Sequence, residues 1–193
     1  MGEISLIVGL GNPGAEYAGT RHNAGFRFVG AVLAEFGGSL RAEGRFSGRT
    51  AKIAIAGREI WLLEPDTFMN HSGEAVSRLA QYYKIPIDEI LVVHDELDLS
   101  PGTVRLKQGG GAGGHNGVAD VAEHLGGNGF MRLRIGIGRP ASGAQLVSYV
   151  LRRAPVAEQE LIDAAIRDSL EHIEDIVHGR TQKAMNALHT HAR

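Results

Sequence analysis

A short apolar run that leads directly into a glycine-rich segment is the feature that most constrains the fold of this chain. Residues 4–8 form the apolar run, and residues 9–26 continue as GLGNPGAEYAGTRHNAGF. Apolar residues then recur at spacings of three and four up to residue 36, before Gly37 and Gly38. This order predicts a buried strand, a long loop and a helix packed on a sheet, as in α/β proteins.

The glycines of this segment are open to two interpretations. Gly9, Gly11 and Gly14 match G-x-G-x-x-G, the pattern of a dinucleotide-binding turn. Such a turn runs straight into a helix, whereas this loop continues to about residue 26, and no acidic residue ends a second strand about twenty residues later. We therefore favour a loop that presents polar side chains above the end of the first strand. These side chains are Asn12, Tyr17, His22 and Asn23.

Strands and helices continue to alternate along the rest of the chain. We expect strands at 50–56, 59–63, 90–93, 103–107 and 132–136. We expect further helices from about 72 to the residue before Pro86, at 118–125, at about 156–177 and briefly at the end of the chain. Because the first two strands of this set form a hairpin, the sheet is mixed. The predicted fold class is α/β: a single domain with a twisted, mostly parallel mixed β-sheet and helices on both faces.

Length and composition are typical of one globular domain, and we expect residues 1–193 to form it. Within it, residues 138–154 are interpreted as a gating cover over a site, and residues 155–193 as C-terminal helices. The sequence has neither a signal peptide nor a membrane span, so we expect a cytoplasmic protein without a membrane partner. The absence of Cys excludes disulfides, thiolate zinc sites and a thiol nucleophile.

Positive charge is concentrated in one part of the chain. The formal net charge is −2, yet residues 101–153 contain seven Lys and Arg against two Asp and Glu. A local basic zone in a slightly acidic protein suits a phosphate-bearing partner. A solvated surface without a ligand is the other interpretation, and charge counting leaves both open.

Several side chains able to do chemistry follow predicted strand ends, where ligands of α/β proteins usually bind. A histidine can serve as a general base, a carboxylate can orient it, and carboxamides can bind an oxygen that gains charge. This set is sufficient for ester hydrolysis by activated water. Its members are His22, Asp95, His115, Asn12, Asn23, Asn70 and Asn116.

Other chemistries have weaker support in the sequence. No G-x-S-x-G motif is present, which argues against a serine nucleophile. A metal site remains open, although H-E-x-x-H is missing and carboxamides are poor ligands for transition metals. Its candidate ligands are His22, His94, His115, Asp95 and Asp98. Each group also has a structural interpretation: His94 as a packed residue, Asp95 as a loop cap and the asparagines as Asx turns.

Five segments resemble the bacterial-type peptidyl-tRNA hydrolases. They are residues 9–26, FMNHSGEAV, HDELDL, GGGAGGHNG and RLRIGIGRP, and their order and spacing match as well. The resemblance implies a monomeric, tRNA-binding enzyme of translation and ribosome rescue, with neither a metal nor another cofactor. Its substrate would be peptidyl-tRNA, bound through the acceptor stem and 3′ end, and it would cleave the ester between the peptide and the 3′ ribose.

The resemblance also implies roles for individual residues. His22 would activate water and Asp95 would orient His22, while Asn12 and Asn70 would contact the peptidyl part and help to position the water or carbonyl. Asn116 would engage the peptide backbone or water near the 3′ end. Tyr17 and Met69 would line the pocket, with His115 and Asn23 as further substrate contacts. Lys107 and Arg134 would clamp the tRNA 5′ phosphate.

Two other functions compete with this hydrolase. The first is a noncatalytic RNA-binding protein that holds acceptor ends through the basic residues 101–153. The second is a metal-dependent amidase. Ala112 and His71 depart from residues common in the family, which leaves the position of the water less defined.

Overall fold

Four parallel strands form the centre of the sheet. The computed structural model describes residues 2–190. The central strands, in spatial order, are β4 (Arg58–Pro65), β1 (Leu6–Gly9), β5 (Ile90–Glu96) and β7 (Met131–Gly136). All seven residues of β5 are buried, as expected for a parallel strand covered on both faces.

Antiparallel strands extend this centre on both sides, so that the full order is β2-β3-β4-β1-β5-β7-β6. On one side β3 (Gly48–Ile55) forms the predicted hairpin with β4, and β2 (Arg41–Glu43) forms the edge. On the other side β6 (Val104–Gln108) pairs with β7. The backbone N–H of Leu106, on the outer edge of β6, donates to His189 Nε2 at 3.2 Å.

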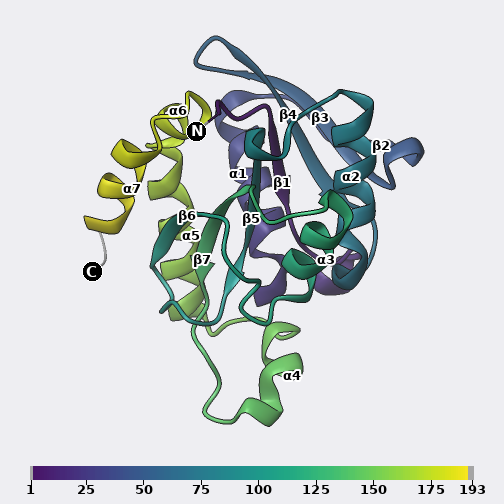
Figure 1. Cartoon of the computed structure of the whole chain (residues 1–193). Coiled ribbons are helices and arrows are strands. Elements are labelled where there is room, and N and C mark those ends of the chain that lie inside the picture. Colours follow the sequence, from purple (N-terminus) through teal and green to yellow (C-terminus); the bar gives the residue numbers. More distant parts are fainter. Residues whose placement is uncertain (1, 191–193) are drawn as a thin grey trace.

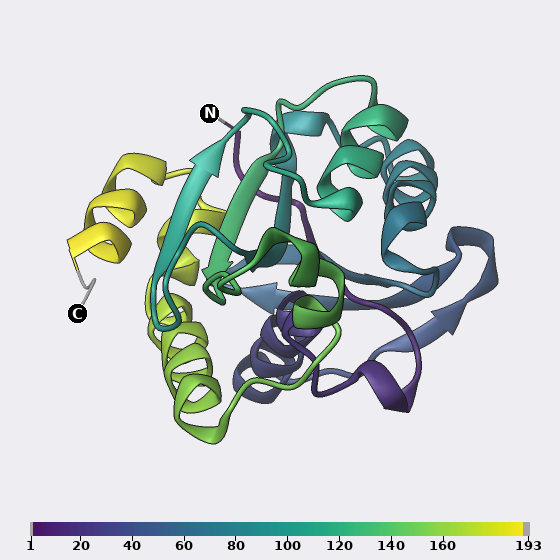
Figure 2. The same ribbon diagram turned by 90° about the horizontal axis from the view of Figure 1, so that it is seen from below.

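Helices cover both faces of the sheet (Figures 1 and 2). Helices α1 (Ala24–Phe36) and α5 (Val156–Leu170) pack with β5, β6 and β7 in one apolar core. Helices α2 (Ser72–Tyr82) and α3 (Asn116–Leu125) pack with β1 and β5 in a second core. The C-terminal helices α6 (Ile173–Val177) and α7 (Thr181–Thr190) complete the first core beside β6. This arrangement confirms the predicted fold class.

Three elements differ from the sequence-based expectations. The helix expected over about 156–177 is interrupted at Glu171 and His172, and this break allows α6 to bury Ile173 and Val177. Strand β2 was not predicted because it is only three residues long, two of them are charged and none is buried. Strand β5 extends to Glu96 rather than ending at Val93, because its pairing with β7 continues to the end of that strand.

Short elements connect the main ones. The 3-10 turns are η1 (Ala15–Tyr17), η2 (Arg21–Asn23), η3 (Gly44–Phe46), η4 (Met69–His71), η5 (Ile87–Glu89) and η6 (Gly143–Gln145).

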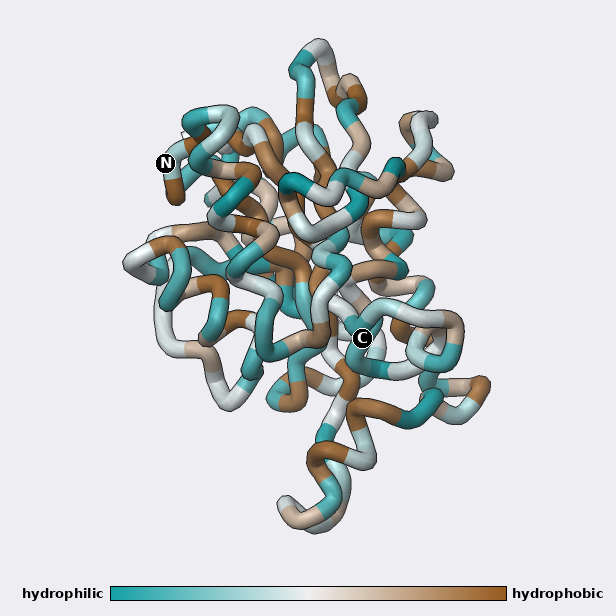
Figure 3. Tube along the Cα trace, turned by 90° about the vertical axis from the view of Figure 1, so that its right-hand side faces the viewer, coloured by the Kyte–Doolittle hydropathy of each residue, from teal (hydrophilic) through white to brown (hydrophobic). Residues whose placement is uncertain are grey.

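Helix α4 (Leu146–Val150) lies in a segment that projects beyond the carboxyl ends of the parallel strands (Figures 1 and 2). Figure 3 shows hydrophobic positions along this projecting segment. Val147, in α4, has 72% of its surface exposed.

Helix α1 begins in direct contact with the backbones of two central strands. A Cβ atom on Gly25 would lie 2.4 Å from both Leu10 N and Val93 O, and one on Gly9 would lie 2.3 Å from Gly25 O. Leu10 N donates to Val93 O at 3.0 Å in the same region. Only glycine allows such an approach, so these two positions fix the start of α1 against the ends of β1 and β5.

None of the helices within residues 2–190 combines the length and the apolar composition needed to span a membrane.

The contact at Gly25 leads to a stability prediction. Gly25→Ala should lower the free energy of unfolding by about 3 kcal/mol, the upper range for overpacking, because the added methyl group meets backbone atoms that cannot rotate away. Gly30→Ala is the matched control, since Gly30 is in the same helix and an added Cβ there would meet nothing within 4 Å. This control should stabilise the protein by about 0.5–1 kcal/mol. Urea unfolding of both variants measures the difference in free energy of unfolding. Equal stabilities of the two variants would show that the backbone contact at Gly25 does not require glycine.

Candidate active site

A buried carboxylate with two histidine partners lies at the centre of the candidate site. Asp95 is 3% exposed near the carboxyl end of β5. Its Oδ2 lies 2.9 Å from His22 Nδ1, and its Oδ1 lies 2.7 Å from His115 Nε2. Burial disfavours the charge of Asp95, but the charges and hydrogen bonds of the two histidines outweigh it and hold the Asp95 pKa well below its usual range. Asp95 is therefore ionised at neutral pH.

His22 has one ring nitrogen available for chemistry. It lies in η2, immediately before α1, and its Nδ1 is engaged with Asp95. Burial lowers the pKa of His22, but the charge and the hydrogen bond of Asp95 raise it more, so that it stays above the ordinary 6.5. With Nδ1–H donating to the carboxylate, Nε2 carries the lone pair of the neutral ring and can accept a proton.

His115 has both ring nitrogens in use. It is the N-cap residue of α3, where its Nδ1 accepts the backbone N–H of Val118 at 3.3 Å. An accepting Nδ1 places the ring proton on Nε2, which donates it to Asp95. His115 thus orients the carboxylate through the oxygen that His22 does not contact.

His94 belongs to the packing beneath the site, as its structural interpretation predicted. It is 1% exposed, and its Nδ1 lies 2.8 Å from the backbone oxygen of Asp95. Burial, followed by the charge of His115, lowers the pKa of His94 to about 3. A histidine that stays neutral in this way can support the β5 backbone without adding charge to the site.

A pocket of about 110 Å³ opens beside His22 and Asp95. Asn116, at the start of α3, lines it together with the glycine loop before that helix. Three apolar residues of α4 form another wall: Leu146, Val147 and Val150. Residues of the segment expected to cover a site therefore border this pocket.

Arg21 connects the segment containing α4 to the turn that carries His22. Its Nη1 donates to the backbone oxygen of Tyr149 at 3.0 Å, and its guanidinium carbon lies 3.8 Å from the centre of the Tyr149 ring. Its backbone N–H also donates to the oxygen of Arg152 at 3.0 Å. The residue immediately before His22 thus anchors both α4 and the chain that follows it.

The other predicted residues lie on neighbouring loops. Asn23 is 1% exposed and holds the backbone of Asn12 by two hydrogen bonds of 2.9 Å. Asn12 Oδ1 accepts the backbone N–H of buried Met69 at 2.7 Å. Asn70 and Asn116 are exposed. The ring of Tyr17 meets that of Phe68 edge to face at 6.2 Å.

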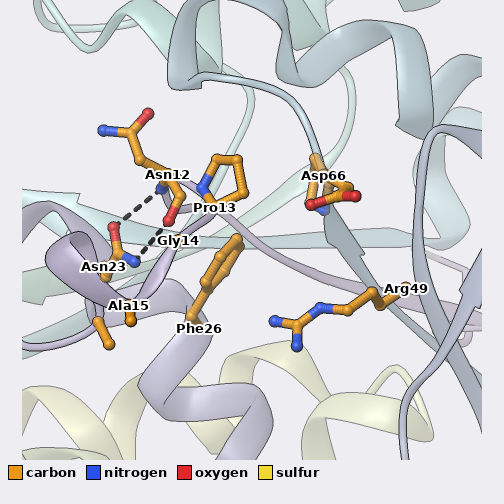
Figure 4. Close-up of a pocket in the computed structure, with 10 residues that line it drawn as sticks. Asn12, Pro13, Gly14, Ala15, Asn23, Phe26, Arg49 and Asp66 are labelled. Atoms are coloured by element: carbon orange, nitrogen blue, oxygen red, sulfur yellow. Dashed lines mark hydrogen bonds between the residues drawn. The ribbon is translucent and has the colours of Figure 1, made fainter.

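Asn12 and His22 line two different pockets, whereas we expected them to face one cleft. The second pocket, of about 360 Å³, is bordered by Asn12 and Asn23 and extends to Phe26, Arg49 and Asp66 (Figure 4). The separation follows from the hydrogen bonds of the loop. They direct the Asn12 side chain toward Met69, while His22 turns toward Asp95.

A group of cations lies on the β6–β7 part of the sheet. Lys107 pairs in register with Arg132, and Arg105 with Arg134. Like charges directly opposite each other destabilise a sheet, which makes this surface a natural place for an anion. Lys107 is exposed, and Arg134 Nε lies 2.7 Å from Glu96 Oε1. This Glu96 ion pair could not be predicted from the sequence, since only the pairing of β5 with β7 brings the two side chains together.

The metal site considered from the sequence is assembled only in part. One ligand atom from each of His22, Asp95 and His115 lies within 4.8 Å of the others, so these residues could hold an ion. The same atoms form the direct hydrogen bonds described above, and His94 instead bonds a backbone oxygen. Asp98 is paired with Arg139 at 2.6 Å.

Comparisons with known proteins agree on one family. The peptidyl-tRNA hydrolase family profile matches residues 6–193. The peptidyl-tRNA hydrolase of Edwardsiella ictaluri is 54% identical over 186 residues, covering 96% of this chain and 95% of that protein. The Marinomonas sp. enzyme is 50% identical over 191 residues, 98% of each. The crystal structure of Acinetobacter baumannii peptidyl-tRNA hydrolase superposes with a TM-score of 0.93, at 48% identity, over 96% of this chain and 94% of that one. The chain therefore belongs to the peptidyl-tRNA hydrolase family.

Proposed function

We propose that this chain hydrolyses the ester between the C-terminus of a peptide and the 3′ ribose of tRNA, with His22 as general base and Asp95 as its orienting carboxylate. Family membership supports peptidyl-tRNA as the substrate. The observation that carries the mechanism is the 2.9 Å contact between His22 Nδ1 and Asp95 Oδ2. It leaves His22 Nε2 unprotonated beside a pocket.

The proposed reaction needs no group beyond these side chains and one water molecule. His22 Nε2 takes a proton from the water as its oxygen attacks the ester carbonyl, and the ionised Asp95 stabilises the resulting imidazolium. The tetrahedral intermediate then collapses, the bond to the 3′ ribose oxygen breaks, and His22 returns the proton to that oxygen. Free peptide and tRNA leave, and His22 is neutral again.

The asparagines supply recognition that does not depend on peptide sequence. Asn12 accepts from Met69 through Oδ1, which leaves its Nδ2 as a donor to a carbonyl oxygen. Exposed Asn70 and Asn116 can both donate to and accept from a peptide backbone. We assign Asn23, whose amide holds the Asn12 backbone, to positioning this loop.

Further residues complete the proposed site. His115 positions Asp95, and Tyr17 and Met69 line the path of the substrate. Lys107 and Arg134 bind the 5′ phosphate of the acceptor stem, with Glu96 holding Arg134 in place until the phosphate arrives. The segment 138–154 covers the pocket from the side of α4. We further propose that the enzyme acts as a monomer in the cytoplasm.

Removal of the base tests the catalytic assignment against the noncatalytic RNA-binding alternative. His22→Ala should reduce peptide release from purified peptidyl-tRNA by about 10²–10⁴-fold, the usual contribution of general base catalysis, while tRNA binding is retained. Unchanged turnover would exclude His22 as the base. The wild-type assay repeated with EDTA should give the same rate, and loss of activity on chelation would favour the metal-dependent amidase.

The pH dependence tests the His22–Asp95 pair. Because His22 must be neutral to accept a proton and its pKa is raised, kcat/KM should increase with pH through an apparent pKa above 6.5. Asp95→Asn removes the charge that raises this pKa, while burial, which lowers it, remains. In this variant the rising limb of the kcat/KM profile should therefore move to lower pH, and kcat should fall.

Asp98→Asn is the control for this profile, since Asp98 is half-exposed and paired with Arg139. It should leave both the limb and kcat unchanged. An Asp95→Asn profile with its limb at the wild-type position would contradict the proposed coupling.

Substrates with and without the 5′ phosphate test the phosphate site. Removing the charges of Lys107 and Arg134 together should raise KM for the phosphorylated substrate about tenfold, as expected for lost charge-assisted hydrogen bonds, and spare kcat. For the same tRNA without its 5′ phosphate, variant and wild type should have equal KM values. An equal loss on both substrates, or a loss mainly in kcat, would count against the assignment.

A further inference from the structure

The strand order gives the proposed substrate a direction across the sheet. The phosphate-binding cations lie on β6 and β7, Asp95 lies at the end of β5, and the Asn12 loop follows β1. The next strands in the same direction are β4 and β3. A substrate with its tRNA over β6 and β7 and its ester at His22 therefore extends its peptide toward β4 and β3.

The second pocket lies in that direction. Its volume of about 360 Å³ is within the usual range for ligand sites. The Asn12 loop forms one side, and Arg49 at the start of β3 and Asp66 after the end of β4 form the other (Figure 4). Because His22 and Asn23 are consecutive but line different pockets, the loop that carries the proposed base also forms a wall of this second pocket.

The polar groups of this pocket match a peptide backbone better than a phosphate. Arg49 can donate hydrogen bonds, and the exposed Asp66 can accept them. Pro13 and Phe26 provide apolar walls between these groups. Both donors and acceptors suit an amide chain, whereas the Asp66 carboxylate would repel an anion.

The Arg49 side chain is held by an ion pair with a buried carboxylate and remains partly exposed to solvent. It pairs through Nη2 with Glu64, its neighbour in register on β4, and Glu64 is 4% exposed while Arg49 is 46% exposed. The guanidinium of arginine has five N–H donors, so those that do not contact Glu64 can donate to a ligand. Burial raises the pKa of Glu64 to about 7 in spite of the opposing effect of Arg49.

We propose that this pocket is a peptide subsite, which binds the backbone of the substrate peptide beyond the residue attached to tRNA. The assignment rests on the proposed ester hydrolysis and adds to it a dependence on peptide length. A substrate with a single blocked amino acid ends before the pocket, whereas a longer peptide enters it and gains the contacts with Arg49 and Asp66.

Two substrates that differ only in peptide length test the subsite. The same tRNA carries either N-acetyl-alanine or N-acetyl-hexaalanine, so that side chains add no recognition. Ala15→Trp fills the pocket from an exposed position without removing a polar contact, and Arg49→Ala removes the donor. Each variant should lower kcat/KM for the long substrate about tenfold through KM, as the loss of one or two hydrogen bonds would, and leave the short substrate unchanged.

Matched variants outside the pocket control for general effects. Ala34→Trp places the same bulk on an exposed position of α1, and Lys52→Ala removes an exposed, ion-paired cation from β3. Both variants should have the same kcat/KM as the wild type on each of the two substrates. If Arg49→Ala lowers the melting temperature because Glu64 is left unpaired, Ala15→Trp, which keeps that pair, decides the question.

The outcomes separate the subsite from the activity on which it rests. If wild type fails to cleave even the short substrate, the proposed function is wrong. If wild type cleaves the short substrate and Ala15→Trp lowers kcat/KM equally for both lengths, or for neither, the pocket is not a peptide subsite and the hydrolase assignment stands.

Discussion

The close contact between the start of α1 and the ends of β1 and β5 determines most of the geometry of the site. Gly9 and Gly25 allow backbones to approach where a single Cβ atom would meet its neighbours at 2.3–2.4 Å. His22 precedes Gly25 by three residues, and Asp95 follows Val93, whose oxygen meets the same contact, by two. The distance between His22 and Asp95 is therefore set by main-chain packing. Long, flexible side chains would hold it less well, because each rotamer fixed in the site costs entropy.

The two histidines on Asp95 differ in what their second nitrogen contacts. In His115 that nitrogen caps α3, which fixes the ring proton on Nε2 and uses both nitrogens. In His22 the second nitrogen faces a pocket. In the proposed mechanism, the same residue type thus serves as a fixed support at one oxygen of the carboxylate and as a proton acceptor at the other. The helix cap makes this difference, since the carboxylate bonds each ring at a similar distance.

Periodicity and turn residues were sufficient to predict the hairpin at β3 and β4, the buried β5 and most helices, because these depend on local patterns. Positions after strand ends also identified His22 and Asp95 as candidates. Contacts that depend on tertiary packing could not be predicted: His115 with Asp95, Glu96 with Arg134, and the hydrogen bonds that place Asn12 and His22 in separate pockets. The break at Glu171 and His172 was missed because the apolar stripe continues across it.

The His189 contact with β6 has a consequence for solubility. The opposite edge of the sheet, β2, is three residues long and carries charged side chains, which discourages pairing with another molecule. Strand β6 is longer, and the backbone N–H of Leu106 on its outer edge is satisfied by a side chain from α7. Without α7 this edge would offer unpaired backbone groups to a second chain. Helix α7 thus covers part of an edge at which strands of different molecules could otherwise pair.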